Sequence, residues 1–127
     1  MATIIGPNDR LHVGKQVTDI STCFIVTSGG DIWIEDHAVI GWKVKFLCEH
    51  YDYSLRNIKT EDPPKSFEIR IGKGAWIGSC CVIVGPCTIG DNAVIGAGSV
   101  VVKQTVPANQ LWAGNPAKFI RTIRFKD

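Results

Sequence analysis

Several features are missing from this 127-residue sequence, and each absence excludes a class of protein. It has no apolar run near the ~20 residues that a membrane-spanning helix needs, and its N-terminus lacks the apolar core of a secretory signal. Its five cysteines show no CxxC spacing of the metal-binding kind, and two of them, Cys80 and Cys81, are adjacent. We therefore expect a cytoplasmic protein with reduced, mostly buried thiols, no membrane span and no metal cofactor.

The sequence also has little net charge, +2, and no basic stretch interleaved with aromatic residues, so we expect no nucleic-acid partner. The charge that is present is unevenly placed. From residue 103 to residue 126 there are five basic residues and no acidic one, namely Lys103, Lys118, Arg121, Arg124 and Lys126. Taken alone, this basic run fits either a solvated surface or a site for a small polyanion.

The dominant pattern is a repeat of six residues. Six consecutive hexapeptides open with a β-branched residue, at Ile71, Ile77, Ile83, Ile89, Ile95 and Val101. The fifth residue of each is small: Ala75, Cys81, Cys87, Ala93, Ser99 and Thr105. A strict period of six fits neither the period of a helix nor the alternation of a half-buried strand. It predicts an all-β fold, a solenoid of short parallel strands.

Three hexapeptides per coil give a triangular cross-section, with one short strand on each side and the large side chains inside. Residues 18 positions apart then stack, which pairs Ile71 with Ile89, Ile77 with Ile95, and Ile83 with Val101. Burial of each such side chain contributes roughly 1.5–3 kcal/mol, so the stacked rows stabilise the coil.

The N-terminal half carries the same repeat less regularly, at Val13, Asp19, Ile25, Ile34, Ile40 and Phe46. Asp19 is a poor core residue, so we expect its coil to be imperfect or partly exposed. The twelve hexapeptides amount to about four coils in a single domain, residues 1–127. A protruding loop, residues 47–70, separates the two sets of six.

The repeat ends near residue 106. Asn115 followed by Pro116 has the form of a helix N-cap and first helical position, and Phe119, Ile120 and Ile123 fall on one helical face. We therefore predict a short C-terminal α-helix, residues 116–125, that covers the strand edges of the last coil.

Three stretches resemble the hexapeptide-repeat acyltransferases, and within them the branch of the galactoside and maltose O-acetyltransferases. They are residues 71–79 (IGKGAWIGS), 88–101 (TIGDNAVIGAGSVV) and 113–118 (AGNPAK), and with the weaker repeats the resemblance covers roughly residues 13–124. The resemblance implies a left-handed parallel β-helix and acetyl-CoA as the acyl donor. It also implies homotrimers whose active sites lie between neighbouring subunits.

Transfer of an acetyl group to a hydroxyl needs a base, and histidine has a suitable intrinsic pKa. The chain offers His12, His37 and His50. The resemblance implies His50, because the family's catalytic histidine stands where a loop leaves the solenoid; independently, loops held by rigid scaffolds often carry catalytic groups. Glu49, Asp52 or a backbone carbonyl remains open as the partner that fixes the tautomer of His50.

The remaining site residues are implied by the same resemblance. Ser79 is the expected oxyanion donor. The expected contacts of CoA are Ser79, Ala97, Val102, Lys103, Lys118 and Arg121. The one-sided basic run then meets the phosphates of CoA. We expect Trp76 in the wall of the cleft, and Asp52 and Tyr53 in the acceptor site.

We therefore predict an acetyl-CoA-dependent O-acetyltransferase that acts on a sugar or polysaccharide-precursor hydroxyl by direct transfer in a ternary complex. The same groups would serve an N-acyltransferase that acts on an amino-sugar nucleotide or a xenobiotic. A γ-type carbonic anhydrase would need two histidines close together in the repeat frame, which the sequence lacks. A non-catalytic solenoid is the remaining alternative, and it leaves His50, Ser79 and the basic run without a role.

Overall fold

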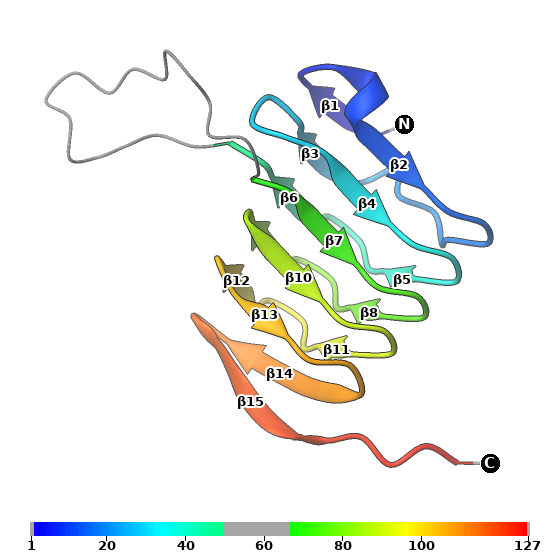
Figure 1. Cartoon of the computed structure of the whole chain (residues 1–127), viewed down its shortest axis with the longest axis vertical. Coiled ribbons are helices and arrows are strands. Elements are labelled where there is room, and N and C mark those ends of the chain that lie inside the picture. The colour runs from blue at the N-terminus through cyan, green and yellow to red at the C-terminus, as the bar shows by residue number, and fades with distance from the viewer. Residues whose placement is uncertain (1, 50–66, 127) are drawn as a thin grey trace, which may run out of the picture.

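A computed structural model of the chain describes residues 2–49 and 67–126. Its strands form three five-stranded sheets, which we call A, B and C, and Figure 1 shows them as the sides of one stack of coils. Sheet A contains β1 (Thr3–Ile5), β3 (Phe24–Val26), β6 (Lys45–Leu47), β9 (Val82–Val84) and β12 (Val100–Val102). Sheet B contains β2 (Leu11–Val13), β4 (Ile32–Ile34), β7 (Ile69–Ile71), β10 (Cys87–Ile89) and β13 (Thr105–Val106). Sheet C contains β5 (Val39–Ile40), β8 (Trp76–Ile77), β11 (Val94–Ile95), β14 (Gln110–Gly114) and β15 (Ala117–Thr122).

The chain passes from sheet A to sheet B to sheet C, so each coil contributes one strand to each sheet. Four coils are complete: β3–β5, β6–β8, β9–β11 and β12–β14. The predicted all-β solenoid of about four coils is therefore confirmed. A single 3₁₀ turn, η1 (Asn8–Arg10), is the one helical element in the described part of the chain. Within residues 2–49 and 67–126, no helix has the length and apolar character required to cross a membrane.

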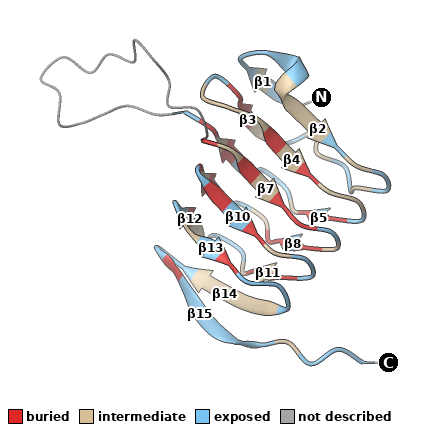
Figure 2. Ribbon diagram, viewed as in Figure 1, coloured by how far each residue is buried: buried red, intermediate tan, exposed pale blue. Residues whose placement is uncertain are grey.

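The predicted stacking is confirmed by the strand registers. Ile71 pairs with Ile89, Ile77 with Ile95, and Ile83 with Val101. The rows continue across the predicted loop: Ile34 pairs with Ile71, Ile40 with Ile77, and Phe46 with Ile83. These residues are at most 4% exposed, and they belong to the buried interior drawn in red in Figure 2. The insertion between β6 and β7 therefore leaves the register of the core unchanged.

The sixth hexapeptide departs from the predicted frame. Val106 pairs with Ile89, although it is only 17 positions after it. Val106 is buried, whereas Thr105 is exposed, so the prediction of Thr105 in a small interior slot is wrong. The last coil is one residue shorter than the repeat, and a shift of one residue turns a strand side chain to the opposite face.

The expected irregularity at Asp19 is present. Residues 15–20 form no strand beside β5, and the Thr18 hydroxyl instead bonds to the backbone N–H and C=O of Ile40 (2.7 and 3.2 Å). Asp19 is exposed and accepts hydrogen bonds from the backbone N–H and the hydroxyl of Ser21 (2.8 and 3.0 Å). The backbone hydrogen bond is the main cause that lowers the pKa of Asp19. The carboxylate thus stays at the surface of an imperfect coil.

The predicted C-terminal helix, residues 116–125, is wrong. Residues 117–122 form β15, which pairs antiparallel with β14, and Gly114 enters the turn between them with φ +111°. The outer edge of β14 carries backbone groups that need partners, and an added strand supplies cross-strand hydrogen bonds that a helix would not. Asn and Pro favour turns as well as helix starts. The strand edge of the last coil is therefore covered by β15, and not by the predicted helix.

Candidate active site

Three corners that join sheet C to sheet A lie directly above one another, and we call them the Ser79 edge: residues 41–43, 78–80 and 96–98. The backbone N–H of Trp42 donates to the Ser79 hydroxyl oxygen at 2.9 Å, and the Cys80 N–H donates to the Trp42 carbonyl at 2.8 Å. The Gly98 N–H donates to the Ser79 carbonyl at 2.9 Å. Trp42, Ser79 and Ala97 therefore follow each other in this order along the edge.

Two glycines allow these corners to approach closely. A Cβ on Gly41 would lie 2.5 Å from the backbone nitrogen of Ser79, and one on Gly78 would lie 2.5 Å from the backbone nitrogen of Ala97. Both distances are far shorter than van der Waals contact. Only a residue without a side chain fits here, so the backbone of each coil rests against the next one.

The backbone N–H of Ser79 lacks a hydrogen bond that the N–H groups of Lys15, Trp42 and Lys73 make in the same slot of the repeat. At three corners, the residue at this position donates its N–H to a side-chain oxygen one coil further on: Lys15 to Asp36 (2.8 Å), Trp42 to Ser79 (2.9 Å) and Lys73 to Asp91 (2.8 Å). The residue one coil beyond Ser79 is Ala97, whose methyl group cannot accept a hydrogen bond. The Ser79 N–H therefore lacks this cap, and it belongs to a residue that is only partly buried.

The tip of the β14–β15 hairpin lies next to the Ser79 edge. The Ser99 hydroxyl accepts the Gly114 N–H at 3.0 Å, and a Cβ on Gly96 would meet the side chain of Ala113. Gln104 donates its side-chain amide to the Ala117 carbonyl (2.8 Å) and accepts the Val102 N–H (3.2 Å). These contacts hold the hairpin tip against the end of β12.

Of the predicted CoA contacts, Ser79, Ala97, Val102 and Lys118 lie around this hairpin tip, since Lys118 pairs with Ala113. The other two, Lys103 and Arg121, line separate cavities. Lys103 lines a cavity of about 410 Å³ at the corner between sheets A and B, with Glu68, Pro86, Cys87, Thr88, Gln104 and Thr105. One chain therefore does not gather all the predicted basic residues in one place.

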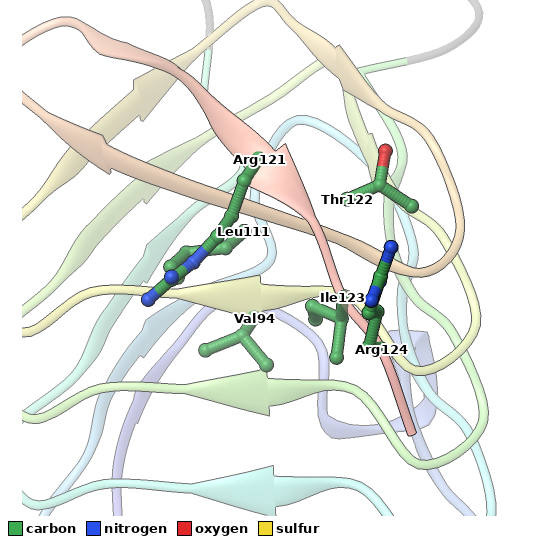
Figure 3. A pocket seen from close by; sticks show the side chains of 6 residues that line it. All are labelled: Val94, Leu111, Arg121, Thr122, Ile123 and Arg124. Carbon is green, nitrogen blue, oxygen red and sulfur yellow. The ribbon is translucent and has the colours of Figure 1, made fainter.

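Arg121 lies on sheet C, opposite Leu111. It lines a cavity of about 540 Å³ with Val94, Leu111, Thr122, Ile123 and Arg124, and Figure 3 shows the two arginine side chains standing apart around an apolar floor. Neither guanidinium forms an ion pair with a residue that the structure describes. The cavity thus offers two free positive charges beside apolar surface.

Three predicted site residues, His50, Asp52 and Tyr53, lie outside the described residues. The chain on either side is placed: β6 ends at Leu47, β7 begins at Ile69, and the buried Cys48 thiol donates a hydrogen bond to the Phe67 carbonyl. Burial raises the pKa of Cys48 to about 11. The two ends of the predicted loop therefore meet at the solenoid.

The other two histidines are placed away from the Ser79 edge. The ring of His12, in β2 of sheet B, bonds to Asp31 (3.0 Å) and stacks on Trp33 with 3.8 Å between centroids. His37 is exposed at a corner between sheets B and C, with φ +64°. In the described part of the chain, no group of three or more His, Cys, Asp or Glu side chains has the geometry to hold a metal ion.

Two tryptophans lie on or near this edge. Trp76, the predicted cleft wall, pairs with Val39 and Val94 on sheet C and is 54% exposed. Trp42 is 71% exposed and was not among the residues that the sequence singled out. The sequence did carry a signal for Trp42, because Trp42 follows a glycine and holds the same slot of the repeat as Ser79. Only the stacking of the coils shows that the two residues are in contact.

Comparisons with known proteins show which families the chain is similar to. Residues 68–103 match the family described as bacterial transferase hexapeptide (six repeats). The chain is 53% identical over 62 residues to the galactoside O-acetyltransferase of Escherichia coli K12, a match that covers 49% of this chain and 30% of that protein. The chain spans less than two thirds of the length of the curated relatives it matches.

Solved structures extend the likeness to almost the whole chain. A galactoside acetyltransferase in complex with coenzyme A is 31% identical, with a TM-score of 0.79 over 98% of this chain and 64% of that one. A maltose O-acetyltransferase from Clostridium difficile 630 is 28% identical, with a TM-score of 0.71 over 98% and 68%. The chain is thus similar to the hexapeptide-repeat acyltransferases, and among them to the galactoside and maltose O-acetyltransferases.

Proposed function

We propose that this chain transfers the acetyl group of acetyl-CoA to a hydroxyl of a sugar or polysaccharide precursor. The observation that carries the proposal is the Ser79 backbone N–H, which lacks the side-chain cap that the N–H groups of Lys15, Trp42 and Lys73 have. An uncapped donor on a rigid edge is suited to a charge that develops only during the reaction. The galactoside acetyltransferase with bound coenzyme A, to which the chain is similar, supports the choice of donor.

The reaction is a direct transfer. A base removes the proton of the acceptor hydroxyl as its oxygen attacks the thioester carbonyl. The carbonyl oxygen then carries the negative charge of the tetrahedral intermediate, and the Ser79 N–H donates a hydrogen bond to it. The intermediate collapses as the C–S bond breaks, and the sulfur of CoA leaves and takes up the proton.

His50 is the proposed base. The alternatives are less suited: His12 is held by Asp31 and Trp33, and His37 lies at a different corner of the prism. A positioned base contributes about 10²–10⁴-fold to the rate. In the sequence, His50 comes two residues after the buried Cys48 and three residues after the end of β6.

For CoA, we propose that the pantetheine arm lies along Ala97 and the hairpin tip, and that the lysines at 103 and 118 and Arg121 meet its phosphates. Lys103, Lys118 and Arg121 are exposed side chains in a run without acidic residues. Because one chain places them at different corners, a second copy of the chain would have to complete the site. This requirement supports the proposed homotrimer with sites between subunits.

The outer face of sheet A is the proposed interface of that homotrimer. It presents Ile5 (50% exposed) and Val102 (38%) beside Phe24, Leu47 and Val84. Near its N-terminal end it has a largely apolar groove of about 540 Å³, lined by Ile5, Phe24, Val26, Ser28, Lys45, Leu47 and Glu49. Parallel sheets are usually covered on both faces, and no described segment covers this one (Figure 1). The free thiols and the CoA donor fit a cytoplasmic location.

The decisive experiment measures release of the CoA thiol from acetyl-CoA with sugars, nucleotide sugars and amino sugars as acceptors. Transfer to a sugar hydroxyl gives an ester, which hydroxylamine cleaves, whereas transfer to an amino group gives a resistant amide. We expect acceptor-dependent thiol release and a hydroxylamine-sensitive product. No thiol release with any acceptor, together with no binding of CoA, would refute the proposed function.

A further inference from the structure

Trp42 is a large apolar side chain without a place in the core. At 71%, its exposed fraction is the highest among the large apolar residues that the structure describes as exposed. Its backbone, in contrast, is fixed to the next coil, because its N–H donates to the Ser79 hydroxyl (2.9 Å) and its carbonyl accepts from the Cys80 N–H (2.8 Å). The indole thus points into solvent from a backbone that hydrogen bonds hold in place.

The order of residues along the Ser79 edge determines what Trp42 can contact. Ala97 follows Ser79 on one side and lies next to the hairpin tip, while Trp42 lies on the other side of Ser79. If the acyl carrier lies along Ala97 and its carbonyl is held at Ser79, the open approach to that carbonyl is from the Trp42 side. The second substrate must therefore pass over or rest on Trp42.

The chemistry of the indole narrows the class of that substrate. A flat, electron-rich ring with no charged group of its own favours an apolar, slightly positive surface, such as the face of axial C–H groups that a pyranose ring presents. The residues that follow along the edge, Ser79 and Cys80, are small. A rigid backbone also lowers the entropy cost of fixing the ligand.

We infer that Trp42 is an acceptor-binding residue: its indole stacks on the C–H face of a pyranose and holds one ring hydroxyl next to Ser79. This inference rests on the proposed function and specifies its acceptor as a cyclic sugar rather than an open-chain alcohol. The alternative role for Trp42 is packing against a second copy of the chain. The apolar area suited to such packing lies on the outer face of sheet A, however, whereas Trp42 stands at a corner.

The test compares Trp42→Ala and Trp42→Phe with the wild type and with Phe125→Ala, a matched control that removes a 56% exposed aromatic ring from the C-terminal segment. Binding of methyl pyranosides is followed by saturation-transfer NMR, which needs no catalysis. We expect Trp42→Ala to weaken pyranoside binding and raise the acceptor KM about tenfold, as loss of a tryptophan anchor does. Trp42→Phe keeps a ring and should change both by less than about threefold.

Three readouts distinguish a sugar-binding role of Trp42 from a subunit contact. The KM for acetyl-CoA, the oligomeric state by light scattering and the KM for glycerol, an open-chain acceptor, should be the same in Trp42→Ala and wild type. Unchanged pyranoside binding in Trp42→Ala, or a wild type that binds no pyranoside, overturns the inference. A change of oligomeric state in Trp42→Ala also overturns it and assigns Trp42 to a subunit contact. A wild type that binds pyranosides through Trp42 but releases no thiol would refute the proposed function alone.

Discussion

Ala97→Ser tests whether the Ser79 N–H is the oxyanion donor, because it supplies a cap of the kind that the Trp42 N–H has. A serine at position 97 would bear the same relation to Ser79 as Ser79 bears to Trp42, whose N–H donates to its hydroxyl at 2.9 Å. The new hydroxyl adds one oxygen at a partly exposed corner, so it leaves the buried rows of the core unchanged. We expect a folded protein with a lower kcat.

The size of the effect lies between two limits. If the capped N–H exchanges its new partner for the oxyanion, the cost is one ordinary hydrogen bond, about 0.5–1.5 kcal/mol, or roughly 2- to 13-fold in rate. If the cap cannot be displaced, the donor is lost, and one oxyanion donor is worth about 10²–10³ in kcat. We therefore predict a decrease in kcat of about 10-fold. The lower bound is about 2-fold and the upper bound is about 10³-fold.

The assay is steady-state release of the CoA thiol, with kcat and the KM for acetyl-CoA measured separately. Ala97→Gly is the matched control, because it changes the same position without adding an oxygen, and its kcat should stay within about threefold of wild type. Ser79→Ala supplies the second comparison. It keeps the Ser79 N–H but removes the acceptor of the exposed Trp42 N–H, so it should lower stability by about 0.5–1.5 kcal/mol with little change in kcat.

A wild-type kcat in Ala97→Ser, with the new hydrogen bond visible in a crystal structure, would refute the role of the Ser79 N–H. A collapse of kcat in Ser79→Ala alone would instead assign the role to the hydroxyl. The two variants thus distinguish the two donors that Ser79 offers.

Three further predictions concern the base, the carrier and the thiols. His50→Ala should lower kcat by about 10²–10⁴ while isothermal calorimetry finds CoA affinity unchanged; a near-normal turnover would assign the base elsewhere. Lys103→Ala combined with Lys118→Ala should raise the KM for acetyl-CoA at low salt, and the difference should narrow at high salt because the phosphate contacts are screened; a salt-independent KM would contradict it. Burial raises the pKa of Cys87 to about 12, of Cys48 to about 11, and also those of Cys23 and Cys81, whereas Cys80 is exposed on the Ser79 edge. At pH 8 the four buried thiols stay protonated, so iodoacetamide should label Cys80 alone. Bound acetyl-CoA should slow the labelling of Cys80. Mass spectrometry of the peptides measures which cysteine is labelled and how fast.

The core was predictable because the repeat is strict. Each coil from Ile71 to Val101 has the same large and small slots, so the register of one coil fixes that of the next. The core row at Ile83 also extends across the insertion to Phe46, since each strand must bury the same face. Thr105 was misplaced because nothing in the local pattern shows that the last coil is one residue short.

The C-terminal element was misjudged for a different reason. Residues 116–125 have a plausible helix start and a helical apolar face, and both are local signals. The free edge of β14 is not local to that segment, and its unpaired backbone groups decide in favour of a strand. The apolar residues Phe119 and Ile120 consequently stay 52% and 53% exposed.

The sequence by itself determined the solenoid and its buried rows, because a period of six residues runs along the chain, and its motifs suggested the chemistry that we propose. The tertiary structure alone decided what surrounds Ser79. Trp42 and Ala97 are 37 and 18 positions away from it, and their contacts arise only when the coils stack. Neighbouring coils therefore decide that the Ser79 N–H has no cap, that the Trp42 indole is exposed and that Lys103 and Arg121 lie apart. No single stretch of the sequence shows these features.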